Sequence, residues 1–427
     1  MKRESERVHP LSSTRWRGTA ASGGCPESHN SPALSIKLPS VPSGEELFGA
    51  AARLHGHLLG RHYRSGLLRG PDAGVRFNLR AWRFVKSAFD FLPWGDDYAF
   101  MQTQGYWILA NWMLFEAMGD RRYRELAIET TGAVLALQTA EGFWRYPLPE
   151  RRHLVATVEG NWGAIGLLAT YAREPRQEYI EGAVRWYKFL VNRIGFQEHE
   201  RGEAINYFDR PRGKVPNNSV EAAWFFVRLW KATGENRYLE HVAPLVEFVA
   251  SVQLASGELP YIVAGPYERA RPHYLCFQYN AFQYLKLAWL AAVMPETRVA
   301  GILPPLARFL ASGVRPVGRL TAAETAATAA ADCAHLGGGG PEVDYYTAAL
   351  AAALHEAART LRAHDTESGG WSGRLYARLL QRQRADGSFG YSTGDYGLLR
   401  DSRSYPRPQV MMLFHLLYGC GLGEGLM

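Results

Sequence analysis

The chain has 427 residues, of which 47% are hydrophobic and 21% charged, and its formal net charge is +7. This is the composition of a globular protein with enough apolar side chains for a large core. The sequence contains no Lys/Arg-dense helix and no nucleic-acid motif, which argues against a nucleic-acid partner. The four cysteines lie far apart without a CxxC pair, as expected for a reducing cytoplasm.

The first part of the chain differs in composition from the rest. Residues 1–43 begin MKRESERVHPLSSTRWRG and remain rich in Ser, Gly and Pro. They lack the apolar stretch of a signal peptide, and no run of about 18 apolar residues that would span a membrane occurs anywhere. We therefore predict a disordered basic leader over residues 1–43, a single domain over residues 44–427 and a cytoplasmic location.

A repeat dominates the remainder of the sequence. Six apolar helices each follow a polar loop rich in Gly and Pro, and they open near Tyr98, Asn161, Asn217, Tyr279, Asp344 and Tyr405. Their spacing of roughly 60 residues is that of one helix pair with its loops. Amphipathic helices lie between them, at residues 120–138, 177–194, 236–253 and 373–383.

The apolar helices suit an inner ring and the amphipathic helices suit an outer ring. A closed ring is favoured because an open stack would leave two apolar faces in water. The sequence therefore predicts an all-α fold, an (α/α)6 toroid of six helical hairpins. Every long loop runs from an outer helix to an inner one, so the polar loops should gather at one end.

Three of these loops share the pattern Q-x3-G-x-(bulky apolar)-x-Tyr. They start at Gln138, Gln253 and Gln383, and their bulky residues are Trp144, Leu259 and Phe389. The glycine can adopt the left-handed turn that ends a helix, and the glutamine can bond the freed backbone groups. We expect the bulky residue to be buried between neighbouring hairpins.

The Q-x3-G-x-W pattern is similar to the QW repeat of the terpenoid cyclases and protein prenyltransferases. The order of loop and inner helix also resembles six-hairpin glycosidases, polysaccharide lyases and glucuronyl epimerases. The resemblance covers about residues 45–425 and implies the toroid fold and not one chemistry. The D-x-D-D acid motif of the cyclases is absent, and Asp332, Cys333 and His335 lack the second half of a prenyltransferase zinc site.

The loops deliver polar side chains to the starts of the inner helices, including Glu159. A carboxylate in an apolar helix is costly unless it is paired or used, histidine titrates near neutrality, and tyrosine beside an acid or histidine suits proton transfer. Carboxylates facing each other across the mouth, such as Asp97 and Glu221, would suit glycoside hydrolysis. The candidate catalytic residues are Asp97, Glu221, His273, Tyr279, Asp344 and Tyr405.

Other side chains of the same loops are suited to binding a substrate. Aromatic and amide groups stack on sugars and hydrogen-bond to them, and Arg403 and Arg407 could clamp an anionic group. The candidate binding residues are Gln102, Asn161, Tyr207, Asp209, Asn218, Asn280, Tyr346, Arg403 and Arg407. Asp96, Asn217 and Ser404 have the position and chemistry of helix caps.

These residues favour an enzyme that acts on an acidic glycan or glycoconjugate by acid/base chemistry, without a cofactor or metal. Hydrolysis, β-elimination and epimerisation remain open. The sequence contains no phosphate-binding glycine loop, nucleophile elbow or HExxH motif. Two alternatives are a relative of the terpenoid cyclases and prenyltransferases, and a non-catalytic toroid that binds a partner through its mouth.

Overall fold

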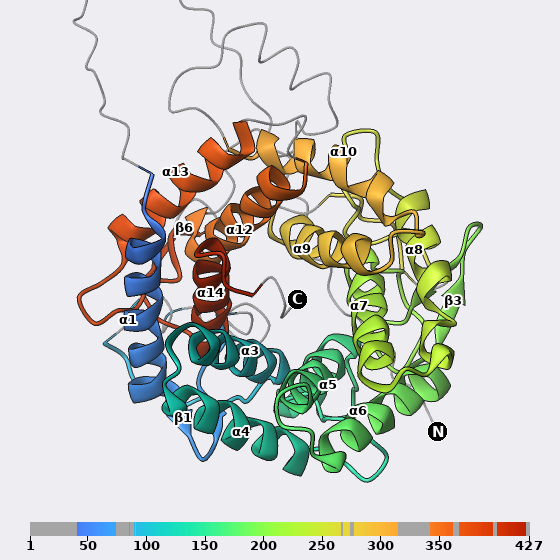
Figure 1. Ribbon diagram of the computed structural model, residues 1–427, viewed down its shortest axis with the longest axis horizontal. Helices are drawn as coiled ribbons and strands as arrows, with labels where there is room; N and C mark the ends of the chain where they lie inside the picture. The colour runs from blue at the N-terminus through green and yellow to red at the C-terminus, as the bar shows by residue number, and fades with distance from the viewer. Residues whose placement is uncertain are drawn as a thin grey trace, which may run out of the picture. The chain divides into compact units, whose positions relative to one another are not determined.

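The structure is a computed structural model that describes residues 41–73, 85, 89, 91–265, 268–273, 277–314, 342–361, 367–395 and 399–423. Residues 39–427 form one compact unit. In the described part of it, six inner helices form a ring inside six outer helices (Figure 1). The inner helices are α3 (Met101–Met118), α5 (Thr157–Tyr171), α7 (Pro216–Thr233), α9 (Gln278–Val293), α12 (Asp344–Thr360) and α14 (Pro406–Gly419). The outer helices are α4 (Arg121–Ala136), α6 (Gln177–Phe189), α8 (Val242–Ser251), α10 (Val299–Ser312), α13 (Glu367–Arg382) and α1 (Gly44–His62).

The ring is closed. Each inner helix contacts the next one, and α14 contacts α3. The first helix, α1, packs on α14 and completes the sixth hairpin, so the first and last described helices close the ring. This confirms the predicted toroid of six hairpins. The inner helices begin close to the predicted positions, with the largest difference at α5, which starts at Thr157 instead of Asn161.

Two outer helices were absent from the predicted set. α10 contains Pro304 and Pro305 in its interior, and these residues obscured its helical pattern because proline usually breaks a helix. α1 follows directly on the Ser- and Pro-rich leader. Its N-terminus is closed by a capping box in which Ser43 Oγ accepts a hydrogen bond from the Glu46 N–H at 3.2 Å.

The three Q-x3-G loops tie neighbouring hairpins together. Their glycines have φ values of 98°, 89° and 82°, and a Cβ added to any of them would lie within 2.6 Å of a backbone oxygen of the next outer helix. Each glutamine donates both to its own turn and to that helix. Gln383 Nε2, for example, lies 2.9 Å from the oxygen of Gly387 and 2.8 Å from that of Ala50 in α1. The wedge residues Trp144, Leu259 and Phe389 are at most 1% exposed, which confirms the prediction for them.

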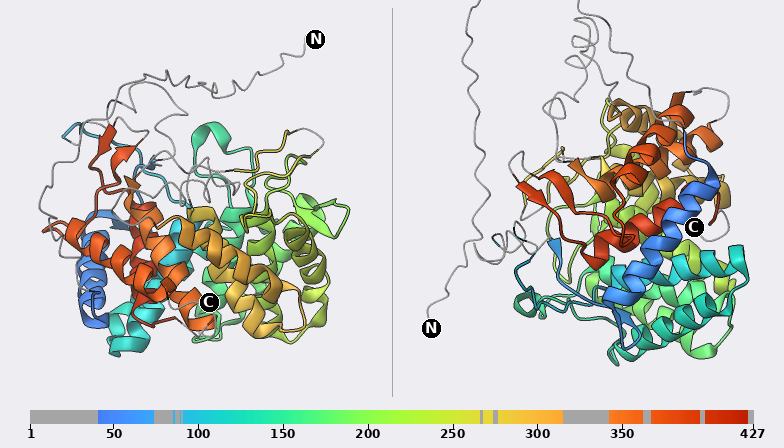
Figure 2. Two further views of the ribbon diagram at one scale, coloured as in Figure 1. Left: turned by 90° about the horizontal axis from the view of Figure 1, so that it is seen from above. Right: turned by 90° about the vertical axis from the view of Figure 1, so that its left-hand side faces the viewer.

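The strands of the described residues are short, antiparallel and confined to connections between an outer and an inner helix. They are β1 (Tyr63–Arg64), β2 (Leu67–Leu68), β3 (Phe196–Glu198), β4 (Glu203–Ile205), β5 (Glu342–Val343), β6 (Ser392–Asp395) and β7 (Leu399–Asp401). These connections all emerge at the same end of the ring (Figure 2). We call this end, where the inner helices begin, the mouth.

Some sequence predictions concern residues outside the described ranges. These are residues 1–40 of the predicted leader and the Asp332–Cys333–His335 stretch. Among the helices that the structure describes, none combines the length and the apolar character needed to cross a membrane.

Candidate active site

A buried glutamate lies at the mouth between two inner helices. Glu159 is the third residue of α5, and only 1% of its surface is exposed. Its Oε2 atom accepts hydrogen bonds from the backbone N–H groups of Met101, at 2.6 Å, and Gln102, at 3.2 Å. These two groups open α3, so the carboxylate is held by the N-terminus of the neighbouring inner helix, where the helix dipole favours a negative charge.

The protonation of Glu159 is finely balanced. Its pKa is raised to about 7, chiefly by burial, because the charged form loses its solvation. This value already includes the opposing effects of the cationic Arg407 and the two N–H groups of α3. A carboxyl with a pKa near 7 exchanges its proton at neutral pH, which is the property required of a general acid or base.

Arg407, at the start of α14, is the cation that lowers the pKa of this glutamate. Its Nε and Nη2 atoms each lie 2.7 Å from one carboxylate oxygen of the buried Asp72, and its guanidinium lies 4.4 Å from the centroid of the Phe100 ring. Burial lowers the pKa of Arg407, but Asp72, Tyr146 and Glu159 outweigh this effect and raise it overall. Arg407, which the sequence suggested as an anion clamp, is therefore a charged group held by Asp72 that acts electrostatically on Glu159.

Tyr146 and Tyr207 interact electrostatically with Glu159 and Arg407, and two further tyrosines extend this group. Burial raises the pKa of Tyr146 to about 12, with Glu159 as the next contribution. Burial also raises the pKa of Tyr207, followed by the effects of Tyr146, Tyr261 and Glu159. The ring centroids of Tyr261 and Tyr279 are 5.4 Å apart. We call Glu159, Asp72, Arg407, Tyr146, Tyr207, Tyr261 and Tyr279 the mouth cluster.

The structure thus brings together four of the predicted residues. Tyr207, Tyr279 and Arg407 contribute side chains to the mouth cluster, and Gln102 contributes its backbone N–H. Their loops are far apart in sequence, and Arg407, Tyr207 and the Gln102 N–H each interact with Glu159, while Tyr279 packs on Tyr261. Acid/base chemistry requires such convergence on one substrate.

Asp97 and Asp344 do not belong to the mouth cluster, and each forms an ion pair with arginine. Asp97 is paired with Arg64 at 2.7 Å and with Arg69 at 2.8 Å, and its side chain is 45% exposed. Asp344 is buried and lies 2.8 Å from Nε of Arg382 on the outer helix α13. Each carboxylate is neutralised locally by arginine, so each stabilises its own hairpin connection.

His273 and Tyr405 also have local partners. Nδ1 of His273 lies 2.9 Å from Oε2 of the buried Glu258. Tyr405 is fully buried and donates its hydroxyl to Asp401 at 2.9 Å. Tyr405 also packs edge-on against Tyr391 in an aromatic cluster that Tyr346 joins through Tyr345.

Three predicted binding amides are buried in the fold. Asn280 exchanges two hydrogen bonds with the backbone of the wedge residue Leu259, and Asn161 accepts one from the Trp186 indole at 2.9 Å. Asn218 is also buried, at 2% exposure. Asn280 thus fixes the loop that precedes its own helix, as Gln409 does for Phe389.

Two further binding candidates lie near the surface. Nη2 of Arg403 donates to the carbonyl groups of Phe89 and Leu92, at 2.7 and 2.5 Å, and its guanidinium lies 5.4 Å from the Trp94 ring centroid. The side chain of Asp209 is exposed, while its N–H donates to Val155. Neither of these residues is held in the mouth cluster.

Glu221 lies in the barrel and has an ion-pair partner. Its Oε2 atom is 2.6 Å from Nζ of Lys286 on α9 and 3.1 Å from Nε1 of Trp162 on α5, and all three side chains are buried. Lys286 also lies over the rings of Trp162 and Trp224, at 5.4 and 5.7 Å. Burial raises the pKa of Glu221, and Lys286 opposes the rise. The cluster joins three inner helices across the core.

The sequence patterns missed most of the mouth cluster. Glu159 was noted at a mouth position but not singled out, and Asp72, Tyr146 and Tyr261 were not identified. The tyrosine that closes a Q-x3-G loop could have pointed to two of them, because it recurs as Tyr146 and Tyr261. In the described part of the chain, no three His, Cys, Asp or Glu side chains are grouped as a metal site.

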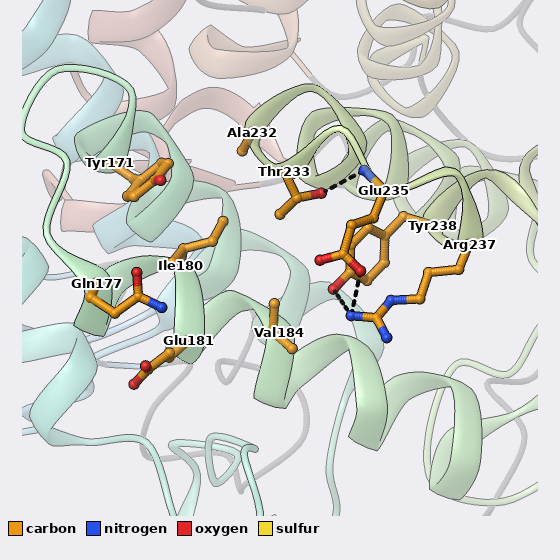
Figure 3. A pocket seen from close by; sticks show the side chains of 10 residues that line it. All are labelled: Tyr171, Gln177, Ile180, Glu181, Val184, Ala232, Thr233, Glu235, Arg237 and Tyr238. Atoms are coloured by element: carbon orange, nitrogen blue, oxygen red, sulfur yellow. Dashed lines mark hydrogen bonds and ion pairs between the residues drawn. The ribbon is translucent and has the colours of Figure 1, made fainter.

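A cavity of about 360 Å³ lies away from the mouth cluster, between α6 and the turn that follows α7 (Figure 3). Its charged groups include an ion pair of 2.6 Å between Arg237 and Glu235. Arg237 also donates to the hydroxyl of Tyr238 at 3.0 Å. These groups already partner one another, in contrast to the titratable carboxyl at the mouth.

The fold is shared with known proteins, although no protein-family model and no curated protein sequence matches the chain. An alpha-1,6-mannanase from Salegentibacter sp. HEL1_6 superposes with a TM-score of 0.60 at 12% identity, covering 87% of this chain and 98% of the mannanase. The cellobiose 2-epimerase of Bacillus thermoamylovorans B4167 gives a TM-score of 0.63 at 10% identity, over 87% of this chain and 98% of the epimerase. A possible GH105 family member from Salmonella enterica gives a TM-score of 0.62 at 13% identity, over 92% of this chain and 97% of that protein.

A polysaccharide lyase, BACCELL_00875, has the same fold, with a TM-score of 0.58 at 14% identity, over 88% of this chain and 97% of the lyase. These likenesses establish that the chain has the toroid fold of the six-hairpin glycosidase-like enzymes. Since one fold supports several chemistries, the function has to be argued from the mouth cluster.

Proposed function

We propose that the chain is a carbohydrate-active enzyme that binds an oligosaccharide at its mouth, with Glu159 as the acid/base residue. The observation that carries this proposal is the buried Glu159 carboxyl with a pKa of about 7 amid tyrosines from several hairpins. Both hydrogen bonds from α3 end on Oε2, which leaves Oε1 to face a substrate. Proton transfer to or from a substrate would take place there.

The surrounding side chains support a sugar as the substrate. Tyrosine rings offer flat apolar faces with a polar edge, which suits stacking on sugar rings and bonding to hydroxyl groups. Arg407 binds Asp72 through Nε and Nη2, and its remaining Nη1 donors would suit the carboxylate of an acidic glycan, such as one containing uronate. The similar structures include a mannanase, an epimerase and a polysaccharide lyase, which supports carbohydrate chemistry without selecting among hydrolysis, epimerisation and β-elimination.

The terpenoid alternative draws on a different region. Tyr106, Trp162 and Phe414 pack around the barrel axis, and an aromatic pocket with one lone acid would suit a carbocation. The acid in that region, Glu221, is paired with Lys286, and Tyr106 and Trp162 stack on each other at 3.9 Å. Because this acid is paired and the aromatic rings pack on each other, this region supports a terpenoid cyclase less well than the mouth cluster supports an enzyme acting on sugars.

The test is turnover of a panel of neutral and uronate-containing oligosaccharides, followed by mass spectrometry. Hydrolysis adds water, β-elimination yields an unsaturated product, and epimerisation yields an isomer of equal mass. We expect Glu159→Gln to lower turnover by about 10²–10⁴-fold, because the amide cannot exchange a proton. The matched control is Glu356→Gln, a buried glutamate near the far end of α12, which should retain turnover.

Two outcomes would overturn the proposal. One is turnover that survives Glu159→Gln unchanged. The other is a folded wild-type protein that neither converts nor binds any oligosaccharide of the panel, as measured by calorimetry.

A further inference from the structure

Three side chains from distant parts of the chain meet between α1 and α14. His57 lies in α1, Asp386 lies in the Q-x3-G turn after α13, and Ser404 lies two residues before α14. Nε2 of His57 is 3.1 Å from Oγ of Ser404, and Nδ1 of His57 is 3.3 Å from Oδ2 of Asp386. The order hydroxyl, imidazole, carboxylate is that of a serine nucleophile, its general base and the group that orients the base.

The serine is not the helix cap that its position suggested. The N-cap position of α14 belongs to Tyr405, and no side chain caps that helix end. The Ser404 hydroxyl is hydrogen-bonded to His57 instead, and Ser404 is partly exposed. A helix cap would have bound a backbone N–H of α14, so the hydroxyl is directed away from its local structural role.

The carboxylate is held in place by its turn. Oδ1 of Asp386 accepts hydrogen bonds from the backbone N–H of Ser388 at 3.0 Å and from its hydroxyl at 2.7 Å. Gln383 fastens the same turn to the oxygen of Ala50 in α1, the helix that carries His57. Oδ2 therefore remains available to the imidazole in a fixed position.

The imidazole has the protonation state of a base. Burial lowers the pKa of His57, Asp386 opposes this effect, and the nearby Arg61 and Arg384 lower the pKa further. A neutral ring protonated on Nδ1, the nitrogen that lies 3.3 Å from Oδ2 of Asp386, can accept the Ser404 proton on Nε2. Its side chain is 9% exposed, while that of Asp386 is 58% exposed, so the group borders on solvent.

We propose that Ser404, His57 and Asp386 form a second catalytic site, which hydrolyses carboxylic esters. Oγ of Ser404 attacks the ester carbonyl carbon while its proton passes to Nε2 of His57, and the C–O bond to the alcohol breaks as His57 returns that proton to the leaving oxygen. Water then attacks the acyl-serine with His57 as base, which releases the carboxylic acid and restores Ser404. Arg61 and Arg384 supply positive potential for the oxyanion.

The first experiment treats the full-length protein with a fluorophosphonate, which forms a bond to an activated serine, and locates the adduct by peptide mass spectrometry. We expect an adduct on Ser404 that is lost in Ser404→Ala and His57→Gln. The same two variants should lose hydrolysis of p-nitrophenyl acetate by about 10²-fold or more. Ser402→Ala, two residues away, is the matched control and should keep both.

Glu159→Gln is included because this site does not rest on the function proposed for the mouth. That variant should be labelled at Ser404 as fast as the wild type, whatever happens to oligosaccharide turnover. The proposal is overturned if no adduct forms, if it forms on another residue, or if His57→Gln leaves the rate of labelling unchanged.

If thermal melting shows that the Ser404→Ala variant is misfolded, a Ser404→Cys variant provides a second test. Its new thiol should react with iodoacetamide faster than Cys420, whose pKa is raised to about 12 by burial. Adding His57→Gln should remove that acceleration, and an unchanged rate would count against the proposed base.

Discussion

Glu159 and Glu221 are two glutamates near the starts of neighbouring inner helices, and each is 1% exposed. Glu221 has the ammonium of Lys286 at 2.6 Å, whereas Glu159 has two backbone N–H groups and an arginine that is already bound to Asp72. The first is one half of a buried ion pair that joins helices. The second is a carboxyl whose charge has no direct cationic partner among its hydrogen bonds, and its pKa is about 7. The two glutamates are equally buried, but their partners differ. Glu221, bound to an ammonium, is structural, whereas Glu159, bound to neutral N–H groups, titrates near pH 7.

The largest expected effect is on stability, from breaking the Glu221 pair. Lys286→Met leaves a buried carboxylate without its cation and should lower the free energy of unfolding by about 3–5 kcal/mol. Urea denaturation at pH 7 measures this change. The double variant Lys286→Met/Glu221→Leu should recover most of the loss, and a single variant as stable as the wild type would contradict the role of the pair.

The second prediction concerns the pH dependence of stability at Glu159. The pKa of about 7 in the folded state lies above the ordinary glutamate value of 4.5, so the folded state binds the proton more tightly. The resulting stabilisation is complete below pH 4.5 and is lost as the pH rises to about 7, a change of about 3 kcal/mol. Between these pH values the wild type should lose this amount relative to Glu159→Gln. A difference between the two proteins that is independent of pH would show that Glu159 is ionised throughout.

The third prediction concerns the charge beside Glu159. The double variant Arg407→Gln/Asp72→Asn removes one charge of each sign and leaves no buried ion alone. If Arg407 binds an acidic substrate, the KM for that substrate should rise by about 10–100-fold, because a hydrogen bond to a charged group contributes about 1.5–3 kcal/mol. The KM for a neutral oligosaccharide serves as the control. An equal rise for both substrates would assign the effect to general damage at the mouth.

The smallest effect is expected at Asp97, which the sequence nominated as catalytic. Its ion pairs with Arg64 and Arg69 are largely exposed, so Asp97→Asn should cost under about 1 kcal/mol and leave turnover intact. Thermal melting and steady-state kinetics measure the two quantities. Loss of turnover with unchanged stability would show that Asp97 takes part in catalysis, and Glu159 would then not differ from it in role.

The architecture could be predicted from the sequence because it is repeated. Six apolar helices at a regular interval and three Q-x3-G loops express one packing solution several times, and each copy supports the others. Inner helices α9 and α14 begin within one residue of the predicted Tyr279 and Tyr405. Periodicity reports which face of a helix is buried, and the toroid follows from that information.

The site could be predicted only in part, because its chemistry depends on partners that are distant in sequence. In the sequence, Asp344 and Glu221 resemble Glu159, because all three are acids near the start of an apolar helix. In the structure, Asp344 is neutralised by Arg382 and Glu221 by Lys286, each from another helix. Asn280 looked like a sugar ligand but holds the backbone of Leu259. Similarly, no local motif connects His57 with Ser404, since the ring closure between α1 and α14 brings them together.

The most direct test of the central claim is an NMR titration of the Glu159 side-chain carboxyl in protein labelled with ¹³C at glutamate Cδ, with Glu159→Gln to assign the resonance. The account predicts a midpoint near pH 7, since burial outweighs Arg407 and the N–H groups of α3. A midpoint near the ordinary glutamate value of about 4.3 would contradict it.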